Sequence, residues 1–348
     1  MQRSLLKRMA CYSTCLAAAA ASLLVVPRGH AQVAPQEQAR GAAVSTADLQ
    51  KKLDAIAAAH HGHVALYAKN LTTGDTVAID AQTPVQTASV IKMTLMLQAF
   101  EQVKAGKLKL SQPVVLTKEN QVGGSGILYL MDPGLTLTLK DVIALMITLS
   151  DNTATNMLID TVGLVPTNAM LARMGLANTY FYKKVFKPAD GPMPADQKKF
   201  GLGKTTAEEM ARVMESIYRC ELGDRDLCTQ MMFIMRNQQD RDMAPRYFRN
   251  DSIDGGYATA DKIGALDAVR ADVALVYTVR GPVVISIFTY DNADTEWTPD
   301  NEGERNIGRL AEAIVDAWSP EGLVSKVTDP IAPAATAAPA QTAATSSH

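Results

Sequence analysis

The chain has 348 residues, 47% of them hydrophobic and 20% charged, and its formal net charge is −2. A chain of this size and composition can bury a large core and form one or two domains. Because the basic residues are scattered, the sequence contains no basic patch that would favour a nucleic acid or an anionic membrane surface as a partner. A small-molecule substrate fits this composition better, and we expect a monomer.

The N-terminal segment has the features of an export signal. Arg3, Lys7 and Arg8 precede an apolar run at residues 9–26, and Gly29 and Ala31 match the small residues of a cleavage site. We therefore predict a signal peptide at residues 1–31 and a periplasmic or secreted protein without a membrane span after cleavage. An uncleaved anchor is the alternative, because an apolar run of about 18 residues is close to the length that spans a bilayer.

Export also changes the interpretation of the four cysteines. Cys11 and Cys15 lie inside the predicted signal, so only Cys220 and Cys228 remain in the mature chain. An oxidising compartment permits a disulfide between them, but their spacing does not show whether the geometry is suitable. A disulfide and a pair of buried thiols therefore both remain open.

Segments of low complexity flank the predicted folded part. Residues 32–45 lack periodicity and are predicted to be a linker. Residues 328–348 are rich in Ala, Pro, Thr and Ser and are predicted to be a disordered tail. One folded domain is expected between them, at residues 46–327.

Strand patterns in this domain occur only near its two ends. Residues 63–68 and 76–79 predict one hairpin and residues 271–279 and 282–290 a second, with helices at 47–59 and 302–318. Apolar stripes predict further helices at residues 89–103, 139–149, 153–161, 165–173, 206–218 and 227–237. These patterns predict an α+β fold: an antiparallel sheet built from both chain ends, flanking helices, and an all-helical domain inserted at about residues 86–250.

The first candidate for chemistry is Ser89-Val90-Ile91-Lys92, at the start of a predicted helix. Residues three apart on a helix share a face, so the Lys92 amine could reach the Ser89 hydroxyl. Burial would lower the pKa of Lys92 enough for it to act as a base. On its own the pattern is weak, because this spacing arises by chance, and a surface pair is then the better interpretation.

Two further motifs follow. Ser150-Asp151-Asn152 lies between two predicted helices, and its residue types are also favoured helix N-caps. Lys262-Ile263-Gly264-Ala265 stands at the end of a strand predicted to begin near Tyr257, where a single lysine is usually just solvated.

Taken in order, the three motifs resemble the Ser-x-x-Lys, Ser-Asp-Asn and Lys-Thr-Gly set of class A β-lactamases and penicillin-binding proteins. The resemblance extends over residues 46–318 and includes Gly124-Ser125-Gly126-Ile127-Leu128 and Ala154-Thr155-Asn156. It implies a β-lactamase-like fold and an acyl-enzyme mechanism without a metal or another cofactor. The implied partners are small β-lactam, peptide or ester substrates.

The resemblance also implies a role for each matching residue. Ser89 would be the nucleophile, Lys92 its base, and Ser150 the relay of a proton to the leaving group. Substrate binding would fall to the remaining positions. These are Asn152 for the amide side chain, Lys262 for the carboxylate with Arg270 as a supplement, and Gly264-Ala265, with the Ala265 N–H joining that of Ser89 in an oxyanion hole.

The chain departs from the family pattern at two positions. The glutamate that activates water for deacylation in class A enzymes is missing: none occurs between residues 120 and 207, and Val185 stands about where it is expected. Asp190 and Asp196 follow nearby in the sequence. Two interpretations stay open for them: a base in place of the glutamate, or an ordinary loop residue. Ile263 replaces a threonine or serine whose hydroxyl binds the substrate carboxylate, which predicts weaker carboxylate recognition.

Three functions therefore remain open: a β-lactamase that turns over slowly, a DD-peptidase or esterase of the same fold, and a penicillin-binding sensor without turnover. Other hydrolase classes fit poorly. His60, His61 and His63 are clustered and expected at the surface, with no sign of a Ser-His-Asp triad or an H-E-x-x-H metal motif. Residues 123–127 fail the G-x-S-x-G pattern at Ile127.

Overall fold

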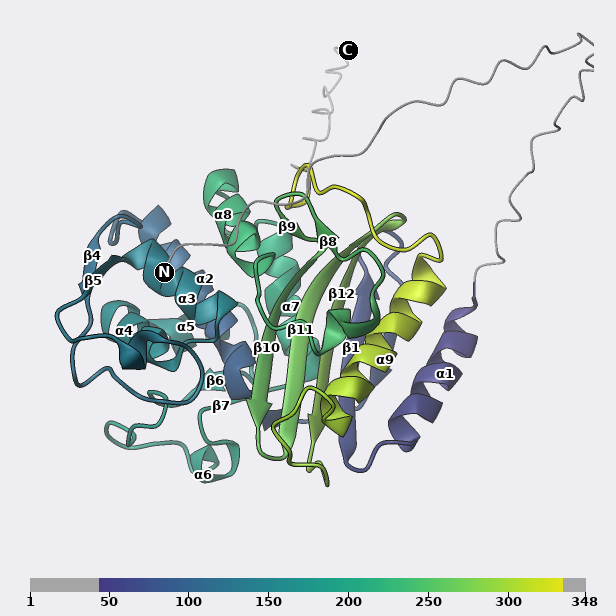
Figure 1. Cartoon of the computed structure of the whole chain (residues 1–348), viewed down its shortest axis with the longest axis horizontal. Helices are drawn as coiled ribbons and strands as arrows, with labels where there is room; N and C mark the ends of the chain where they lie inside the picture. Colours follow the sequence, from purple (N-terminus) through teal and green to yellow (C-terminus); the bar gives the residue numbers. More distant parts are fainter. Residues whose placement is uncertain (1–43, 334–348) are drawn as a thin grey trace, which may run out of the picture. The chain divides into compact units, whose positions relative to one another are not determined.

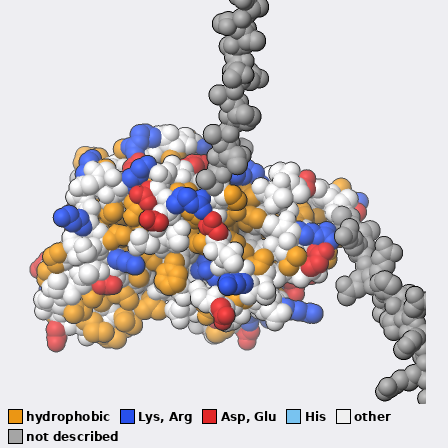
Figure 2. All heavy atoms as spheres, turned by 90° about the horizontal axis from the view of Figure 1, so that it is seen from above, with side chains coloured by type: hydrophobic (Ala, Val, Ile, Leu, Met, Phe, Trp, Pro, Cys, Tyr) orange, Lys and Arg blue, Asp and Glu red, His pale blue; other side chains and the backbone are white. Residues whose placement is uncertain are grey.

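A computed structural model describes residues 44–333 of the protein. The predicted signal peptide at 1–31 and nearly all of the predicted linker lie outside the described residues, as does the tail beyond residue 333. Within the described part of the chain, no helix is long and apolar enough to cross a membrane. Acidic, basic and hydrophobic side chains are interspersed on the face shown in Figure 2, in keeping with the scattered charges of the sequence.

An antiparallel five-stranded sheet in the order β10-β11-β12-β1-β2 forms the centre of the fold (Figure 1). The two ends of the chain supply its strands, which are β1 (His63–Asn70), β2 (Thr76–Ile79), β10 (Thr259–Leu266), β11 (Val269–Thr278) and β12 (Gly281–Tyr290). β1 joins the two hairpins by pairing with β12, with Leu66 opposite Ile287. The predicted sheet built from both chain ends is confirmed.

Two terminal helices, α1 (Thr46–Ala58) and α9 (Glu302–Trp318), lie side by side on one face of this sheet (Figure 1). Leu53 of α1 and Ile307 and Leu310 of α9 are fully buried against strand residues such as Ile285. The apolar stripe of each helix is thus the side that faces the sheet, as the 3.6-residue period requires.

The opposite face of the sheet packs against α7 (Ala207–Tyr218), and the helical region continues beyond the β10 edge (Figure 1). Its centre is α2 (Lys92–Lys104), whose residues 92–100 are all buried, so this helix is surrounded on every side. Around it are α3 (Leu139–Thr148), α4 (Asn152–Val162), α5 (Leu164–Arg173) and α8 (Arg225–Met235), whereas the short helix α6 (Gln197–Phe200) packs against β3 (Val85–Gln86) and β7 (Gly203–Thr205).

Short elements complete the fold. A three-stranded sheet has the order β3 (Val85–Gln86), β7 (Gly203–Thr205), β6 (Tyr180–Phe181), and β4 (Pro113–Val115) pairs with β5 (Thr136–Thr138). A further hairpin consists of β8 (Ser252–Ile253) and β9 (Gly256–Tyr257). The 3₁₀ turns are η1 (Ala88–Ile91), η2 (Leu128–Leu130) and η3 (Ala244–Tyr247). None of these pairings was predicted from the sequence.

Two boundaries differ from the sequence-based expectation. β10 continues to Leu266, so Lys262 lies in the middle of a strand and not at its end. The domain also extends beyond residue 327, because Ile331 is buried in the core and the Ala332 N–H donates to Tyr218 O at 2.8 Å. Residues 328–333 of the predicted disordered tail are therefore packed against the domain.

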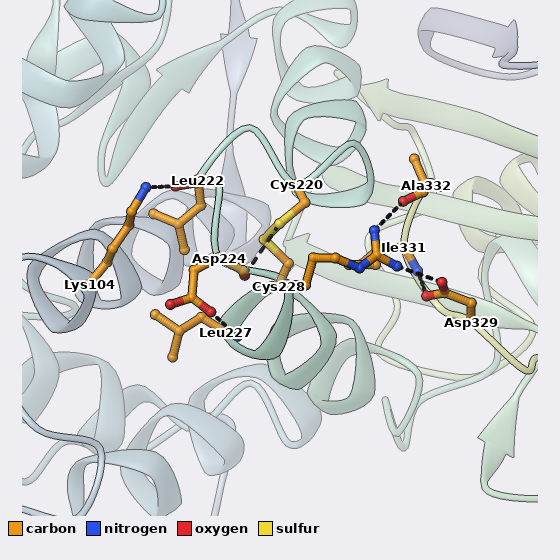
Figure 3. The surroundings of a disulfide bond; sticks show 10 residues. Lys104, Cys220, Leu222, Asp224, Leu227, Cys228, Asp329, Ile331 and Ala332 are labelled. Carbon is orange, nitrogen blue, oxygen red and sulfur yellow. Dashed lines mark hydrogen bonds and ion pairs between the residues drawn. A yellow bond between two sulfur atoms is a disulfide. The ribbon is translucent and has the colours of Figure 1, made fainter. Parts of the chain in front are cut away.

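The open question about the cysteines is settled in favour of a bond. Cys220 and Cys228 form a disulfide that links the end of α7 to α8 (Figure 3). The α8 residue Arg225 in turn pairs with Asp329 at 2.6 Å, which ties the packed C-terminal segment to the same place.

Candidate active site

Ser89 lies in the 3₁₀ turn η1, directly before α2 begins at Lys92. The turn places residues 89 and 92 on one side, because residues three apart eclipse each other in a 3₁₀ helix. Ala88, just before the serine, has a positive φ of 44°. This conformation costs energy for a residue with a Cβ, and such strain is concentrated at functional sites.

The Lys92 side-chain nitrogen is fully buried and lies within hydrogen-bond distance of three oxygen atoms. The acceptors are Ser150 O at 2.6 Å, Asn152 Oδ1 at 2.9 Å and Ser150 Oγ at 3.2 Å. Burial, reinforced by the nearby charge of Lys262, lowers the pKa of Lys92 well below its usual value.

Lys262 of β10 also bonds to the Ser150 hydroxyl. Its Nζ donates to Ser150 Oγ at 3.0 Å and to Ile263 O at 2.7 Å. Burial lowers the pKa of Lys262 to about 8, against the opposing effect of the Asp261 and Asp272 carboxylates. Ser150 Oγ is thus held between two buried lysines, and Ser150 has a strained φ of 54°.

The backbone of β10 passes close to the serine turn at Gly264. A Cβ added there would lie 2.8 Å from the Ser89 N atom, closer than real Cβ atoms approach. Only glycine therefore lets the strand run past Ser89, with Ala265 as the next residue. Two backbone N–H groups beside a nucleophile are the arrangement that an oxyanion hole requires.

Asp151 and Asn152 fix the neighbouring loop. Asp151 caps α4 by accepting from the Ala154 N–H at 2.8 Å, and it also accepts from the Ile127 and Leu128 N–H groups at 2.7 and 2.9 Å. Asn152 accepts from Lys92, and its amide donates to Gly123 O at 3.1 Å. Both ends of the Asn152 amide are therefore engaged within the protein.

A cavity of about 300 Å³ opens over these groups. Ser89 and Ser150 line it together with Gly264 and Ala265 of β10. Its remaining lining residues are Ser125, Asp240, Asp242, Met243, Ile263, Trp297, Thr298, Pro299 and Glu304.

Val185, where the family pattern places a glutamate, is buried in the loop that follows β6. Asn156 of α4 accepts from its N–H at 2.9 Å and donates to its carbonyl at 3.2 Å. Asp196 is bound to Tyr182 at 2.8 Å and Lys204 at 2.6 Å, so it stabilises this loop. Neither Asp190 nor Asp196 lines the cavity.

Arg270 is the one predicted binding residue that the structure separates from the others. Side chains alternate between the faces of a strand, and Arg270 points to the α9 face, where it pairs with Glu304 at 2.9 Å. Lys262 lies on the opposite face, whose neighbour across the β10–β11 ladder is Val273. Because the two side chains lie on opposite faces of the sheet, Arg270 does not supplement Lys262. Its guanidinium bonds instead to Glu304 and to backbone carbonyls.

Sequence reasoning did not identify the acidic part of the cavity. Asp240, Asp242 and Glu304 lie far from the three motifs in sequence, and no local pattern marks them. For Asn156 the sequence did contain a signal, because this residue belongs to the stretch Ala154-Thr155-Asn156 that resembles the family.

The histidines form no site of their own. His60, expected at the surface, is buried and bonds to Asn292 at 2.9 Å, whereas exposed His61 bonds to Glu302 at 3.0 Å. Within residues 44–333, no group of three or more His, Cys, Asp or Glu side chains is placed to hold a metal ion.

Comparisons with known proteins agree with this geometry. Residues 48–318 match the model of the beta-lactamase enzyme family, and no curated protein matches the chain.

A beta-lactamase from Sphaerobacter thermophilus is 28% identical, with a TM-score of 0.69 over 79% of this chain and 98% of its own. A variant of PBP-A, solved as its acyl-enzyme complex with penicillin G, is 22% identical, with a TM-score of 0.67 over 78% and 97%. A beta-lactamase from Chitinophaga pinensis is 21% identical, with a TM-score of 0.66 over 78% and 99%. The protein has the β-lactamase fold, and because the family match spans most of its length it belongs to the beta-lactamase enzyme family.

Proposed function

We propose that the protein is an exported serine hydrolase that forms an acyl-enzyme at Ser89 with β-lactams or related amides and esters. The observation that carries the proposal is the position of Ser150 Oγ between Lys92 and Lys262, in the cavity that Ser89 also lines. Export rests on the predicted signal peptide at residues 1–31.

The proposed reaction uses the two lysines differently. Burial lowers the pKa of Lys92 well below its usual value, which favours the neutral amine that can take the proton of Ser89 as Oγ attacks the substrate carbonyl. The Ser89 and Ala265 N–H groups receive the developing oxyanion. As the carbonyl–nitrogen bond breaks, Ser150 passes a proton to the leaving nitrogen, and Lys262 provides positive charge beside it.

Release of the acyl group is the step that this site supports least for β-lactams. The side chain at position 185 is a buried valine, which can neither accept a proton nor orient water. A β-lactam leaves its amine tethered to the acyl group, so its acyl-enzyme should persist. Peptide and ester leaving groups depart and admit water, which favours a DD-peptidase or esterase for turnover.

Intact-protein mass spectrometry after mixing with penicillin G tests the nucleophile. We expect one covalent adduct on the wild-type protein and none on Ser89→Ala. Lys92→Ala should acylate on the order of 10²–10⁴-fold more slowly, since it removes the positioned base. Ser125→Ala is the matched control, because Ser125 lines the same cavity but is not the proposed nucleophile. An adduct on Ser89→Ala would refute the assignment.

A further inference from the structure

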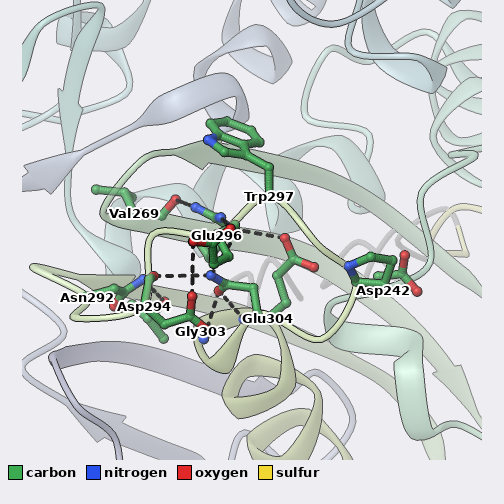
Figure 4. Close-up of polar contacts among 12 residues, drawn as sticks. Asp242, Val269, Asn292, Asp294, Glu296, Trp297, Gly303 and Glu304 are labelled. Carbon is green, nitrogen blue, oxygen red and sulfur yellow. Dashed lines mark hydrogen bonds and ion pairs between the residues drawn. The ribbon is translucent and has the colours of Figure 1, made fainter.

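A tryptophan side chain forms part of the wall of the cavity over Ser89. Trp297 lies in the loop between β12 and α9 and lines this cavity. It is 64% exposed, whereas an indole gains most free energy when it is buried. Figure 4 shows its ring projecting from the loop, away from the polar contacts around Glu296. Folding thus leaves a large apolar ring open toward the space that a substrate of Ser89 would occupy.

The orientation of this ring is fixed by the protein itself. The Trp297 Nε1 donates to Asp267, which follows β10, at 3.1 Å. The Arg270 guanidinium lies over the ring, 4.9 Å from its centroid, and its charge is balanced by Glu304 at 2.9 Å. Because the Arg270 side chain is fully buried while Trp297 is largely exposed, the guanidinium covers one face of the indole and the other face stays open.

Arg270 also fixes the two segments that this contact joins. Its guanidinium donates to the carbonyl of Leu266 and to that of Glu296, the latter at 2.7 Å. These residues directly precede Asp267 and Trp297. Arg270 therefore lies behind the cavity wall and acts on it through the indole. A ring that is already held in place loses little side-chain entropy when it binds a ligand.

The ring lies at one end of the strand that carries the reacting groups. β10 places Lys262 beside Ser150. It then passes the Ser89 turn at Gly264 and leads to Asp267, which holds the indole. In the proposed reaction the leaving group lies at Ser150 and Lys262, so the acyl part of the donor extends the opposite way, toward Asp267. The strand from Gly264 to Asp267 covers about 10 Å, a distance that an acyl chain of several carbons spans.

Resting on the proposed acylation of Ser89, we propose that Trp297 stacks on a flat aromatic group at the far end of the donor's acyl chain. Asp267 and Arg270 are positioning residues, since they act on the donor only through the indole. The site then selects donors whose acyl chain ends in an aryl group over donors of equal bulk without a planar ring. Aromatic rings attract each other beyond the effect of buried area, which gives this preference its physical basis.

A matched pair of activated esters tests the preference. The p-nitrophenyl esters of γ-phenylbutyrate and γ-cyclohexylbutyrate have the same reacting carbonyl, leaving group and chain length, and differ in whether the terminal ring is flat. Second-order acylation rates come from the burst of p-nitrophenol, with the Ser89→Ala rate subtracted as background. We expect the phenyl ester to acylate the wild-type protein about 2–10-fold faster than the cyclohexyl ester.

Variants then locate the preference. Trp297→Leu keeps an apolar side chain without a planar ring and should bring the phenyl-to-cyclohexyl ratio to about 1, whereas Trp297→Phe should retain most of the ratio. Asp267→Ala frees the indole and should lower the ratio on the order of twofold, whereas Asp267→Asn keeps an acceptor and should retain it. Phe233→Leu is the matched control, because Phe233 of α8 is also exposed, at 53%, but does not line the cavity. It should leave the ratio unchanged.

The outcomes separate this inference from the proposed function. Equal rates for the two esters on the wild-type protein, or an unchanged ratio in Trp297→Leu, would overturn this inference alone when Ser89 is still labelled. Equal slowing of both esters by Asp267→Ala would overturn the positioning role of Asp267. Failure of both esters to label Ser89 would overturn the proposed function and this inference with it.

Discussion

Two lysines that share one serine hydroxyl are expected to differ in charge. Lys92 and Lys262 both bond to Ser150 Oγ, and both are fully buried. Two ammonium groups at this separation repel each other strongly away from water. Burial lowers the pKa of Lys262 to about 8 against the opposing effect of nearby carboxylates, whereas burial and the charge of Lys262 together lower the pKa of Lys92 well below its usual value. The surroundings thus favour a positive charge on Lys262, near the Asp261 and Asp272 carboxylates, over one on Lys92.

The valine at position 185 leads to a prediction about lifetime. The penicillin acyl-enzyme of the wild-type protein should persist for minutes or longer, because no positioned base activates water. Val185→Glu should shorten this lifetime by about 10²–10⁴-fold, the usual contribution of a general base. Timed mass spectra after a brief exposure to penicillin G measure the decay of the adduct.

The control for this experiment is Val185→Gln, which has nearly the same shape as the glutamate but no basic carboxylate. Equal acceleration by both variants would mean that loosening of the loop, and not base catalysis, admits water. Release from the wild-type protein at tens per second would show that another base exists, and Asp190→Ala and Asp196→Ala would then be compared.

At the residue scale, the sequence predicted the motifs better than their surroundings. Ser89, Lys92 and Ser150 come together because each motif has a local order that the helices preserve. Arg270 could not be placed from sequence, because the length of the β10–β11 turn decides which face of the strand it occupies. The carboxylates that line the cavity, those of Asp240, Asp242 and Glu304, come from segments more than 60 residues apart and follow no sequence period.

Among the elements, the loop around β6 is attached to the helices by two asparagines. Asn156 of α4 bonds to both backbone groups of Val185, and Asn168 of α5 bonds in the same way to Phe181. A side-chain amide can replace a strand neighbour in this way because it offers one donor and one acceptor. The two bridges attach β6 and the loop that follows it to α4 and α5.

We predict that Asn156→Ala loosens this loop. The change leaves the N–H and carbonyl of Val185 without their partner, and it should lower the free energy of unfolding by about 2–3 kcal/mol. Chemical denaturation measures that loss, and limited proteolysis should show faster cleavage between residues 178 and 200. Asn237→Ala is the control, since Asn237 is only partly buried and bonds locally to Phe233 O. Unchanged proteolysis would show that the bridge does not hold the loop.

The sequence predicted the long elements well, because each has an apolar stripe that must be buried. The helix predicted at residues 302–318 and the helix predicted at 139–149 are observed at Glu302–Trp318 and Leu139–Thr148. By contrast, β3, β6 and β7 have two or three residues each, too few to show an alternation. Their pairing depends on where the helices bring them.

For the molecule as a whole, residues 328–333 pack against the domain, although their composition predicted disorder. The disulfide joins the end of α7 to α8, and Arg225 of α8 pairs with Asp329 (Figure 3). The Tyr277 hydroxyl of β11 donates to Pro330 O. The last described residues thus connect the helical region to the central sheet, because Tyr218 of α7 also accepts from the Ala332 N–H.

This packing predicts that truncation after residue 327 is destabilising and truncation after residue 333 is not. The shorter chain loses Ile331, which is 1% exposed and whose burial contributes about 1.5–3 kcal/mol. It also removes the acceptor of the buried Tyr277 hydroxyl, which costs about 1–3 kcal/mol. We expect a loss of about 2.5–6 kcal/mol in urea denaturation from the sum of these ranges, and Ile331→Ala in the full mature chain should reproduce about 2–4 kcal/mol of it. The chain ending at residue 333 is the control and should unfold like the full mature chain. Equal stability of the 327 and 333 chains would show that residues 328–333 contribute nothing to the fold and that the domain ends where its sequence composition changes.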